Sequence, residues 1–338
     1  MLASELSTPC VTRRQAIGAV AALAATALHG GATAQTPAAA KLAKDHVKGP
    51  LVFLDYDQAE LDAAYDQNVY AANSRQVVNR YTTSSATMRK YVGNPKRFAY
   101  GPTEIEKLDV YTTNRPNAPI NIFLHGGAWR SGTSMQYGFP AEMFVNAGAH
   151  YIAVDFISVG DAGGSLMPMA EQIRRAIAWV YKNAASFGGD PGRIYLSGHS
   201  SGAHLAAVAL ITDWQAQFDV PGDVIKGALC CSGMYDLKGP RLSARSSYVK
   251  FDDRMEQELS PQRYLEKIRT PVIVAHGTEE TPEFKRQAKD FAAALSNAGK
   301  PVTFLLCEQY NHYEIIETMA SPYGLLGRAV IEQMGLKG

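Results

Sequence analysis

Cysteine is scarce in this chain of 338 residues, and its four positions lack the spacing of a disulfide or metal framework. They are Cys10, Cys230, Cys231 and Cys307. The adjoining pair falls within a predicted strand and is interpreted as part of the core. No apolar run approaches the ~18 residues that a membrane-spanning helix needs. A formal net charge of +1 gives no indication of nucleic acid or of an acidic partner. We therefore expect neither a membrane span nor a nucleic-acid partner.

Metal-binding patterns are missing as well. No histidine stands in H-E-x-x-H or in a Cys/His ligand spacing, and Gly126-Gly127 lacks the downstream residues that a nucleotide-binding loop needs. We therefore expect no metal and no cofactor. The chain does have 46% apolar and 19% charged residues, which is typical of a globular protein with one large core. This composition does not define an oligomeric state.

The first 34 residues have the pattern of an export signal. Arg13 and Arg14 precede a modestly apolar, alanine-rich run, and Ala32-Thr33-Ala34 offers an A-x-A cleavage site. Paired arginines before a weakly hydrophobic centre are typical of twin-arginine signals, which direct folded bacterial proteins to their export machinery. We therefore predict a periplasmic or secreted protein. The alternatives are a mitochondrial-type presequence and a disordered alanine-rich tail. Residues 35–50 are expected to form a flexible lead-in.

Strand-like and helix-like patterns alternate along the rest of the chain. Short apolar runs begin near residues 107, 120, 151, 193, 224, 271 and 301, and helical periodicity covers residues 169–187, 201–211, 284–298 and 325–334. This alternation predicts an α/β fold with a mostly parallel central sheet and helices on both faces. We expect the run over residues 301–307 to be a buried strand. Residues 51–338 are predicted to form one domain, in which residues 51–100 are either a lid or an outer wrapping.

The motif around which the chain is organised is Gly198-His199-Ser200-Ser201-Gly202, which fits G-x-S-x-G. A β-prone run precedes it, and a small-residue run of helical length follows it. A sharp strand-to-helix turn lifts the middle serine out of the sheet, and the flanking glycines leave room for that turn. The sequence therefore predicts Ser200 as a nucleophile. His204, one helical turn later, is interpreted as a packed, hydrogen-bonded core histidine.

A second glycine-rich turn follows the predicted strand near residue 120. It reads His125-Gly126-Gly127-Ala128-Trp129. Backbone N–H groups aimed at a carbonyl oxygen stabilise the negative charge that acyl transfer places on it, and glycine lets the backbone come close. We expect an oxyanion hole with donors from Gly127, Ala128 and Ser201, and with Gly126 as a further candidate. His125 is expected to brace this loop.

A serine nucleophile of this type needs a base late in the chain, because the order along the chain is Ser, then Asp or Glu, then His. The candidates are His276, which ends a strand, and His312, which lies in a polar loop after the last apolar run. That loop is where a base can reach a serine across the sheet edge. We predict His312.

The acid that orients this base is less defined by the sequence alone. Either carboxylate can hold the imidazole in the right tautomer. Asp236 follows one predicted strand, and Glu279, Glu280 and Glu283 follow the next. The later strand is the usual place, but spacing does not separate the first two of these glutamates. Asp236 can instead tie down its own loop.

Together these motifs resemble the α/β-hydrolase fold in its esterase and lipase branch, and further segments are similar to kynurenine formamidase-like hydrolases. The resemblance covers residues 55–335. The segments are Glu60-Leu-Asp-Ala-Ala-Tyr-Asp, Ser232-Gly-Met-Tyr-Asp-Leu, Glu280-Thr-Pro-Glu-Phe and Asn311-His-Tyr-Glu-Ile-Ile. In that subgroup the acid stands directly before Thr-Pro-Glu-Phe. The resemblance therefore implies Glu280, with glutamate in place of the frequent aspartate, and it supports Ser200 and His312.

The resemblance implies a serine hydrolase that cleaves small carboxylic esters through an acyl-enzyme, with a small-molecule ester or amide as its partner. Arylformamidase activity, another amide or carbamate hydrolase, and a silent fold used for binding are the alternatives. Two features depart from a formamidase of the cytosolic tryptophan pathway: the export signal, and alanine at position 128, where a bulkier residue is frequent. Aromatic residues beside the motifs are expected to line the pocket: Trp129, Tyr137, Tyr235 and Tyr313.

Overall fold

The computed structural model describes residue 42 and residues 45–337 of the chain. Eight strands form one sheet in the order β1-β2-β4-β3-β5-β6-β7-β8, in which β1, β2 and β4 pair antiparallel and the pairs from β4–β3 to β7–β8 are parallel. The strands are β1 (Lys96–Ala99), β2 (Lys107–Tyr111), β3 (Ala118–Leu124), β4 (His150–Val154), β5 (Gly189–His199), β6 (Ile225–Cys231), β7 (Val272–Gly277) and β8 (Val302–Cys307). The predicted mostly parallel sheet is confirmed.

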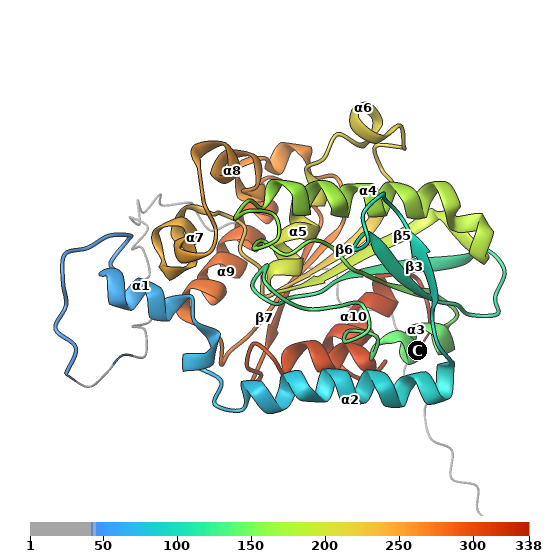
Figure 1. The fold of residues 1–338 in the computed structure, drawn as a ribbon, viewed down its shortest axis with the longest axis horizontal. Helices are drawn as coiled ribbons and strands as arrows, with labels where there is room; N and C mark the ends of the chain where they lie inside the picture. The colour runs from blue at the N-terminus through green and yellow to red at the C-terminus, as the bar shows by residue number, and fades with distance from the viewer. Residues whose placement is uncertain (1–41, 43–44, 338) are drawn as a thin grey trace, which may run out of the picture. The chain divides into compact units, whose positions relative to one another are not determined.

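Two layers of helices cover the sheet (Figure 1). The helices are α1 (Gln58–Ala64), α2 (Ser74–Val92), α3 (Ala141–Ala147), α4 (Met167–Asn183), α5 (Ser201–Leu210), α6 (Trp214–Phe218), α7 (Lys238–Leu242), α8 (Asp253–Glu258), α9 (Pro282–Asn297) and α10 (Leu325–Gln333). Short 3-10 helices are η1 (Gln67–Val69), η2 (Ala184–Phe187), η3 (Ala244–Ser247), η4 (Pro261–Arg263), η5 (Leu265–Lys267) and η6 (Ile315–Ala320).

The core lies in two clusters, one on each face of the sheet. Helices α4, α5 and α9 pack on one face, and α2, α3 and α10 pack on the other. Neighbouring strand residues point to opposite faces, so Ile122 and Leu124 of β3 enter the first cluster while Phe123 enters the second. Because β3 is buried along its whole length, its sequence is apolar almost without alternation.

One sequence-based expectation about strands was wrong, and one strand was missed. The run over residues 301–307 is not buried: β8 pairs with β7 alone, and Phe304 and Leu306 are exposed along it. An edge strand contacts the sheet on one side only, so its apolar residues do not imply burial. Strand β1 is not among the strands predicted from the sequence. It pairs antiparallel with β2 at the other edge.

The segment before β1 contacts the C-terminal part of the chain. Asn73 Nδ2 donates to Glu314 Oε1 at 2.6 Å, and the Tyr81 hydroxyl donates to the backbone oxygen of Tyr313 at 2.5 Å. The last residues of the predicted lead-in are tied down as well, since the N–H of Gly49 donates to Asp57 Oδ2 at 2.7 Å. The predicted export signal lies outside the described residues.

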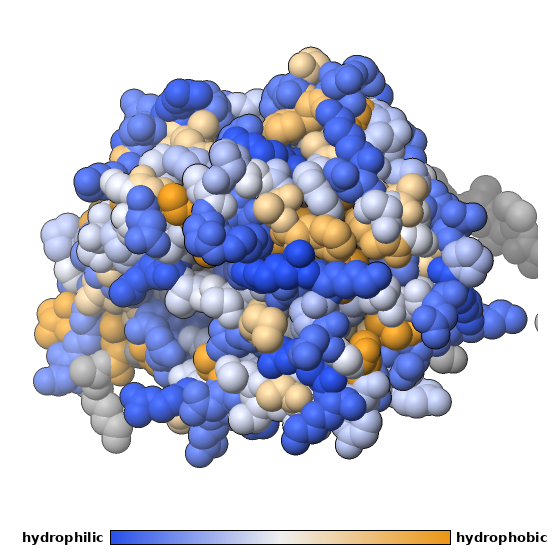
Figure 2. Space-filling view, turned by 45° about the vertical axis from the view of Figure 1, so that its right-hand side comes forward, coloured by the Kyte–Doolittle hydropathy of each residue, from blue (hydrophilic) through white to orange (hydrophobic). Residues whose placement is uncertain are grey.

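Hydrophilic side chains dominate the face of the molecule shown in Figure 2, and apolar residues gather there in separate groups. No helix in the described part of the chain has both the length and the hydropathy to cross a bilayer.

Candidate active site

Ser200 lies at the sharp turn between β5 and α5. Its backbone has φ 57° and ψ −124°, a left-handed conformation that is strained for a residue with a side chain. Its N–H donates to the Cys231 carbonyl at 2.9 Å, which fixes the turn against β6. A Cβ on Gly202 would overlap the carbonyl of Leu124, and one on Gly198 would overlap Gly202. The flanking glycines are therefore required by close packing of the turn.

The structure brings His312 and Glu280 to this serine. The His312 Nδ1–H donates to Glu280 Oε2 at 2.8 Å, which leaves Nε2 free to accept from the Ser200 hydroxyl at 2.9 Å. All three residues are buried. This arrangement can remove the serine proton as the oxygen attacks a carbonyl carbon.

The Glu280 carboxylate is held by four donors. Oε1 accepts from the Gly277 N–H at 2.6 Å and from the Ser232 hydroxyl at 2.7 Å, and Oε2 accepts from His312 and, at 3.4 Å, from Gln67 Nε2. Burial by itself raises the pKa of Glu280. The hydrogen bond and the attraction from His312, together with the hydrogen bonds from Gly277 and Ser232, outweigh this effect, so the pKa lies below its ordinary value of 4.5. The buried side chain therefore remains a carboxylate.

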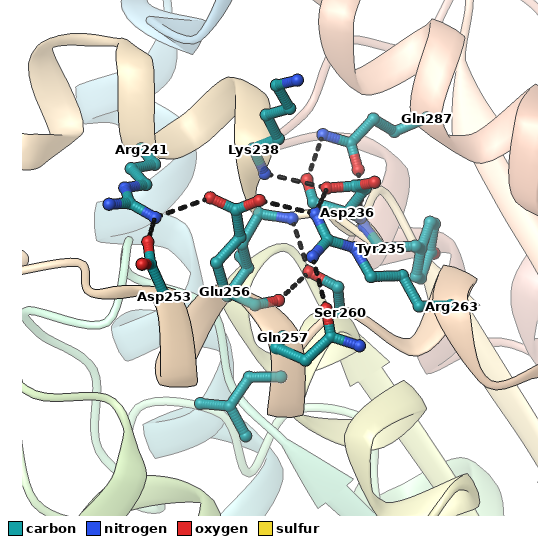
Figure 3. A network of polar contacts seen from close by, with 12 residues as sticks. Tyr235, Asp236, Lys238, Arg241, Asp253, Glu256, Gln257, Ser260, Arg263 and Gln287 are labelled. Atoms are coloured by element: carbon teal, nitrogen blue, oxygen red, sulfur yellow. Dashed lines mark hydrogen bonds and ion pairs between the residues drawn. The ribbon is translucent and has the colours of Figure 1, made fainter.

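Asp236 is placed away from this site. Its Oδ1 accepts from the Lys238 N–H at 2.9 Å and forms an ion pair with Arg263 at 3.1 Å, within a polar network of α7, α8 and the adjoining loops (Figure 3). Its backbone oxygen accepts from Gln287 Nε2 at 3.0 Å. Asp236 therefore stabilises its own loop and is not the acid beside His312. This is one of the two roles that the sequence analysis left open for it.

The other acid and base candidates also have different surroundings. Glu279 is exposed, although it directly precedes the buried Glu280. Glu283 is buried in an ion pair with Arg286 at 2.7 Å. His276 has its Nδ1 within 2.9 Å of the Gly277 carbonyl and packs on Phe304. None of these three is hydrogen-bonded to Ser200 or His312 in the described part of the chain.

The loop after β3 faces the serine. Gly127, Ala128 and Trp129 all have positive φ, at 120°, 55° and 63°. A Cβ on Gly126 would lie 3.0 Å from the Ser200 Cβ, so this glycine lets the loop approach the nucleophile. Within the described residues, no hydrogen bond uses the N–H of Gly127 or Ala128. The N–H of Ser201 is free in the first turn of α5 because a helix provides no acceptor there.

His204, predicted to be a core histidine, and His125, predicted to brace its loop, both have structural contacts. His204 is fully buried, its Nε2 lies 2.8 Å from the Leu259 carbonyl, and its Nδ1 accepts from the Trp129 indole at 3.2 Å. It is thus a core histidine, as predicted. His125 Nδ1 lies 2.8 Å from the Gly126 carbonyl, and its ring stacks on Phe156.

His199 is a cavity residue that the sequence reasoning did not single out. Its Nε2 lies 2.8 Å from the His312 carbonyl, so the Nε2–H donates and holds the loop that carries the base. Burial lowers the pKa of His199 to about 3, and the neighbouring His312 adds to this shift. The ring therefore stays neutral and keeps this bond. In the sequence, the position of His199 directly before Ser200 could have indicated that it lies at the cavity.

Folding stability is expected to fall in mild acid because of buried histidines. The pKa of His199 is lowered to about 3 and that of His204, by burial, to about 4. Below the ordinary value of 6.5 the unfolded chain takes up protons that the folded chain does not. Each histidine therefore removes stability with a slope that rises toward about 1.4 kcal/mol per pH unit as pH falls from 6.5 to 5. Denaturant unfolding at pH 7.5, 6.5, 5.75 and 5 measures this slope.

The control for this prediction is His204→Gln, which lacks one of the buried rings whose pKa is lowered. The variant is expected to be less stable at every pH but to show a shallower decline between pH 6.5 and 5. An unchanged slope in the variant, or a wild-type stability that stays level over this range, would contradict the assignment.

A cavity of about 800 Å³ opens over Ser200. Residues of the N-terminal segment, the loop after β3, the η3 region and the His312 loop line it, among them Tyr65, Gln67, Gly127, Ala128, Tyr137, His199, Arg245, Tyr248, His312 and Tyr313. The described residues include no group of three metal-ligating side chains. The cavity is therefore bounded by four segments from separate parts of the chain, together with the turn that carries His199 and Ser200.

Two of the four predicted pocket aromatics line this cavity and two do not. Tyr137 and Tyr313 are among the lining residues. The prediction for Trp129 is wrong, since its indole is buried against His204. The prediction for Tyr235 is also wrong: its ring stacks on Phe291 of α9, and its hydroxyl donates to the Cys230 carbonyl at 3.1 Å. Proximity to a strand end in the sequence does not fix the side of the loop that a ring occupies.

Comparison with known proteins places this geometry in a family. Kynurenine formamidase of Danio rerio is 36% identical over 247 residues, which is 70% of this chain and 80% of that protein. The chain belongs to the kynurenine formamidase family. The esterase LipQ of Mycobacterium tuberculosis is 30% identical, over 62% of this chain and 55% of that protein. Residues 108–228 also match the BD-FAE family model.

Solved structures agree on the fold. The carboxylesterase EstE1, from a metagenomic library, superposes with a TM-score of 0.62 at 16% identity, over 80% of this chain and 98% of that chain. The esterase Est2 of Thermogutta terrifontis has a TM-score of 0.56 at 23% identity, over 71% and 90%. The α/β-hydrolase fold predicted from the sequence is confirmed, and so is the resemblance to kynurenine formamidase-like hydrolases.

Proposed function

We propose that this chain is a serine hydrolase that cleaves small carboxylic esters through an acyl-enzyme. The observation that carries the proposal is the chain of contacts at the cavity floor, from Ser200 Oγ to His312 Nε2 at 2.9 Å and from His312 Nδ1 to Glu280 at 2.8 Å. Relatives named as esterases, and esterases among the structural neighbours, support hydrolysis of an ester bond.

The residues have the following roles in this proposal. Ser200 Oγ attacks the carbonyl carbon while His312 Nε2 takes its proton, and Glu280 stabilises the imidazolium that forms. The N–H groups of Gly127, Ala128 and Ser201 receive the negative charge on the carbonyl oxygen, with Gly126 giving the loop its close approach. His312 then protonates the departing alcohol. A water molecule, deprotonated by His312, releases the acid and restores Ser200.

Arylformamidase activity is the second candidate. It is favoured by the 36% identity to a protein named kynurenine formamidase over most of that protein. In this reaction the same groups act on a formamide, and the departing group is an aromatic amine that takes its proton from His312.

The test compares kcat/KM of one purified enzyme on p-nitrophenyl acetate, phenyl acetate, a phenyl carbamate and N-formylkynurenine. We expect the aryl esters to be turned over most efficiently. A formamide preference of more than about tenfold, equivalent to about 1.4 kcal/mol of barrier, would reverse the order of the two candidates. Absence of turnover on every substrate, together with no labelling of Ser200 by a fluorophosphonate, would favour a silent fold used for binding.

We also infer export through the twin-arginine machinery to the periplasm or medium. Arg13, Arg14 and the Ala32-Thr33-Ala34 site support it. Fractionation of bacterial cells expressing the full chain tests it, because replacing both arginines with lysine is expected to retain the unprocessed protein in the cytoplasm.

A further inference from the structure

Arg245 lies in η3 and lines the same cavity as Ser200 and His312. The residue is only 9% exposed, so its guanidinium is largely removed from water. A guanidinium keeps its charge when it is buried, because arginine is not deprotonated in proteins. The catalytic cavity therefore has a fixed positive charge in its wall.

The hydrogen bonds of Arg245 use only neutral acceptors. One Nη2–H donates to the Tyr65 carbonyl at 2.9 Å, and one Nη1–H donates to the Tyr248 hydroxyl at 2.8 Å. The Nε–H is buried with no partner. A guanidinium has five N–H donors in a planar fork, so these two bonds leave donors on it unused.

Two other arginines near η3 are paired with carboxylates. Arg241 contacts Asp253 and Glu256, Arg263 contacts Asp236 and Glu256, and both lie in the network of Figure 3. In the part of the chain that the structure describes, no carboxylate forms an ion pair with Arg245. A buried cation without a counter-charge is unfavourable for the folded protein. A ligand that brings a negative charge would remove that penalty.

The carboxylates that share the cavity wall have other partners. Asp62 Oδ1 accepts from the Ala244 N–H at 2.5 Å and from Gln58 Nε2 at 2.9 Å. Asp66 is exposed and accepts from the backbone and side-chain nitrogens of Asn68, both at 3.0 Å. Both therefore fix the N-terminal segment and do not neutralise Arg245.

Aromatic rings surround the guanidinium of Arg245, and one of them contacts the catalytic base. Its carbon lies 5.6 Å from the ring centroid of Trp129, in the loop after β3, and 5.7 Å from that of Phe284. The Phe284 ring in turn contacts the His312 ring, with centroids 4.9 Å apart. Apolar walls strengthen the attraction between the guanidinium and an anion, because they exclude water.

We propose that Arg245 binds a carboxylate of the substrate that does not react, so that this hydrolase selects anionic esters or amides over neutral ones. The inference rests on the proposed function, since it names the substrate class of the same site. A carboxylate fits because its two oxygens match two parallel N–H groups of the guanidinium fork.

The test uses matched substrates that differ only in this charge. One pair carries the group on the alcohol side: 3-(4-acetoxyphenyl)propanoate and its primary amide. The other carries it on the acyl side: mono-4-nitrophenyl glutarate and its primary amide. In at least one pair, the wild-type enzyme is expected to favour the anion by about tenfold or more in kcat/KM. Preference for the neutral partner in both pairs would overturn the proposal.

Two variants locate the effect. Arg245→Met is expected to lower the anion-to-neutral ratio at least tenfold, and Arg245→Lys to restore it in part, since lysine keeps the charge but lacks the fork. Arg130 is the matched control: it lines the same cavity, is exposed, and stacks on Tyr248 with its guanidinium carbon 4.8 Å from the ring. Arg130→Met is expected to keep the ratio within about threefold of wild type. An equal loss in both methionine variants would contradict a site at Arg245.

A binding measurement separates this inference from the hydrolase proposal. Calorimetry with 3-phenylpropanoate and 3-phenylpropanamide needs no turnover. We expect the wild type to bind the carboxylate more tightly, and Arg245→Met to lose that difference. Turnover of esters without any charge preference would refute the inference alone, whereas carboxylate binding at Arg245 without ester turnover would refute the hydrolase proposal alone. If Arg245→Met does not fold, the wild-type preference and the Arg245→Lys variant still decide the outcome.

Discussion

Ser200→Ala is expected to lower kcat on aryl esters by roughly a millionfold, because removal of a triad nucleophile has an effect of this order. The alanine has no atom that can form the acyl bond, while His312, Glu280 and the loop after β3 stay in place. Ser200 makes its structural contact through its backbone N–H to Cys231, and alanine keeps that bond. The fold is therefore expected to be retained. Initial rates over a wide range of enzyme concentration measure the residual activity.

Fluorophosphonate labelling provides an independent readout of the same change. The wild type is expected to gain one label at Ser200, located by mass spectrometry of the peptide, and the alanine variant none. Ser201 is the matched control: its buried side chain directly follows the nucleophile, and only its backbone N–H is assigned to the reaction. Ser201→Ala is expected to label as the wild type does. Labelling that persists in Ser200→Ala would show that another residue is the nucleophile.

Glu280→Gln is expected to lower kcat by about 10⁴-fold, the effect of placing an amide next to a triad histidine. All four partners of Glu280 donate to it, so one of them must face the new NH₂ group. The backbone N–H of Gly277 cannot become an acceptor, whereas the imidazole can move its proton from Nδ1 to Nε2. The amide nitrogen then faces His312 Nδ1. With Nε2 protonated, His312 can no longer take the serine proton.

Glu283→Gln is the control for removing a buried carboxylate. Glu283 lies three residues further on, in the first turn of α9. It is equally buried, and it pairs with Arg286 and the Tyr65 hydroxyl instead of His312. Loss of this pair is expected to reduce thermal stability, since it leaves Arg286 with one partner fewer. Its kcat is expected to remain far above that of Glu280→Gln. The measurements are kcat and the melting temperature of both variants. A kcat of Glu280→Gln within threefold of the wild-type value would contradict the role of Glu280.

Local sequence rules were sufficient for the fold class and for the serine. The turn at Ser200 needs glycine on both sides, a strand before it and a helix after it. All of these features can be recognised within a short stretch of the sequence. The burial of the central strands is likewise predictable from strands such as β3, in which every residue except Asn121 is apolar. His312 was predicted from its place after the last strand, because parallel strands deliver their carboxyl ends to one edge.

The acid required more than local rules. Glu279 and Glu280 are neighbours of the same type, and only the direction of the chain before α9 sends one side chain into the interior and leaves the other exposed. The resemblance to a family distinguished them in the sequence, and the hydrogen bond to His312 distinguishes them in the structure. Spacing alone had no means of doing so.

The sequence by itself determined the sheet, the strained turn and the order of serine, acid and histidine, because each depends on backbone preferences and apolar periodicity over a few residues. Only the tertiary structure decided which surroundings each side chain meets. It buried Trp129 and Tyr235 away from the cavity, and it left Arg245 in the cavity wall without a carboxylate. Those outcomes depend on how helices and loops distant in the chain pack together, and burial and charge pairing are properties of that packing.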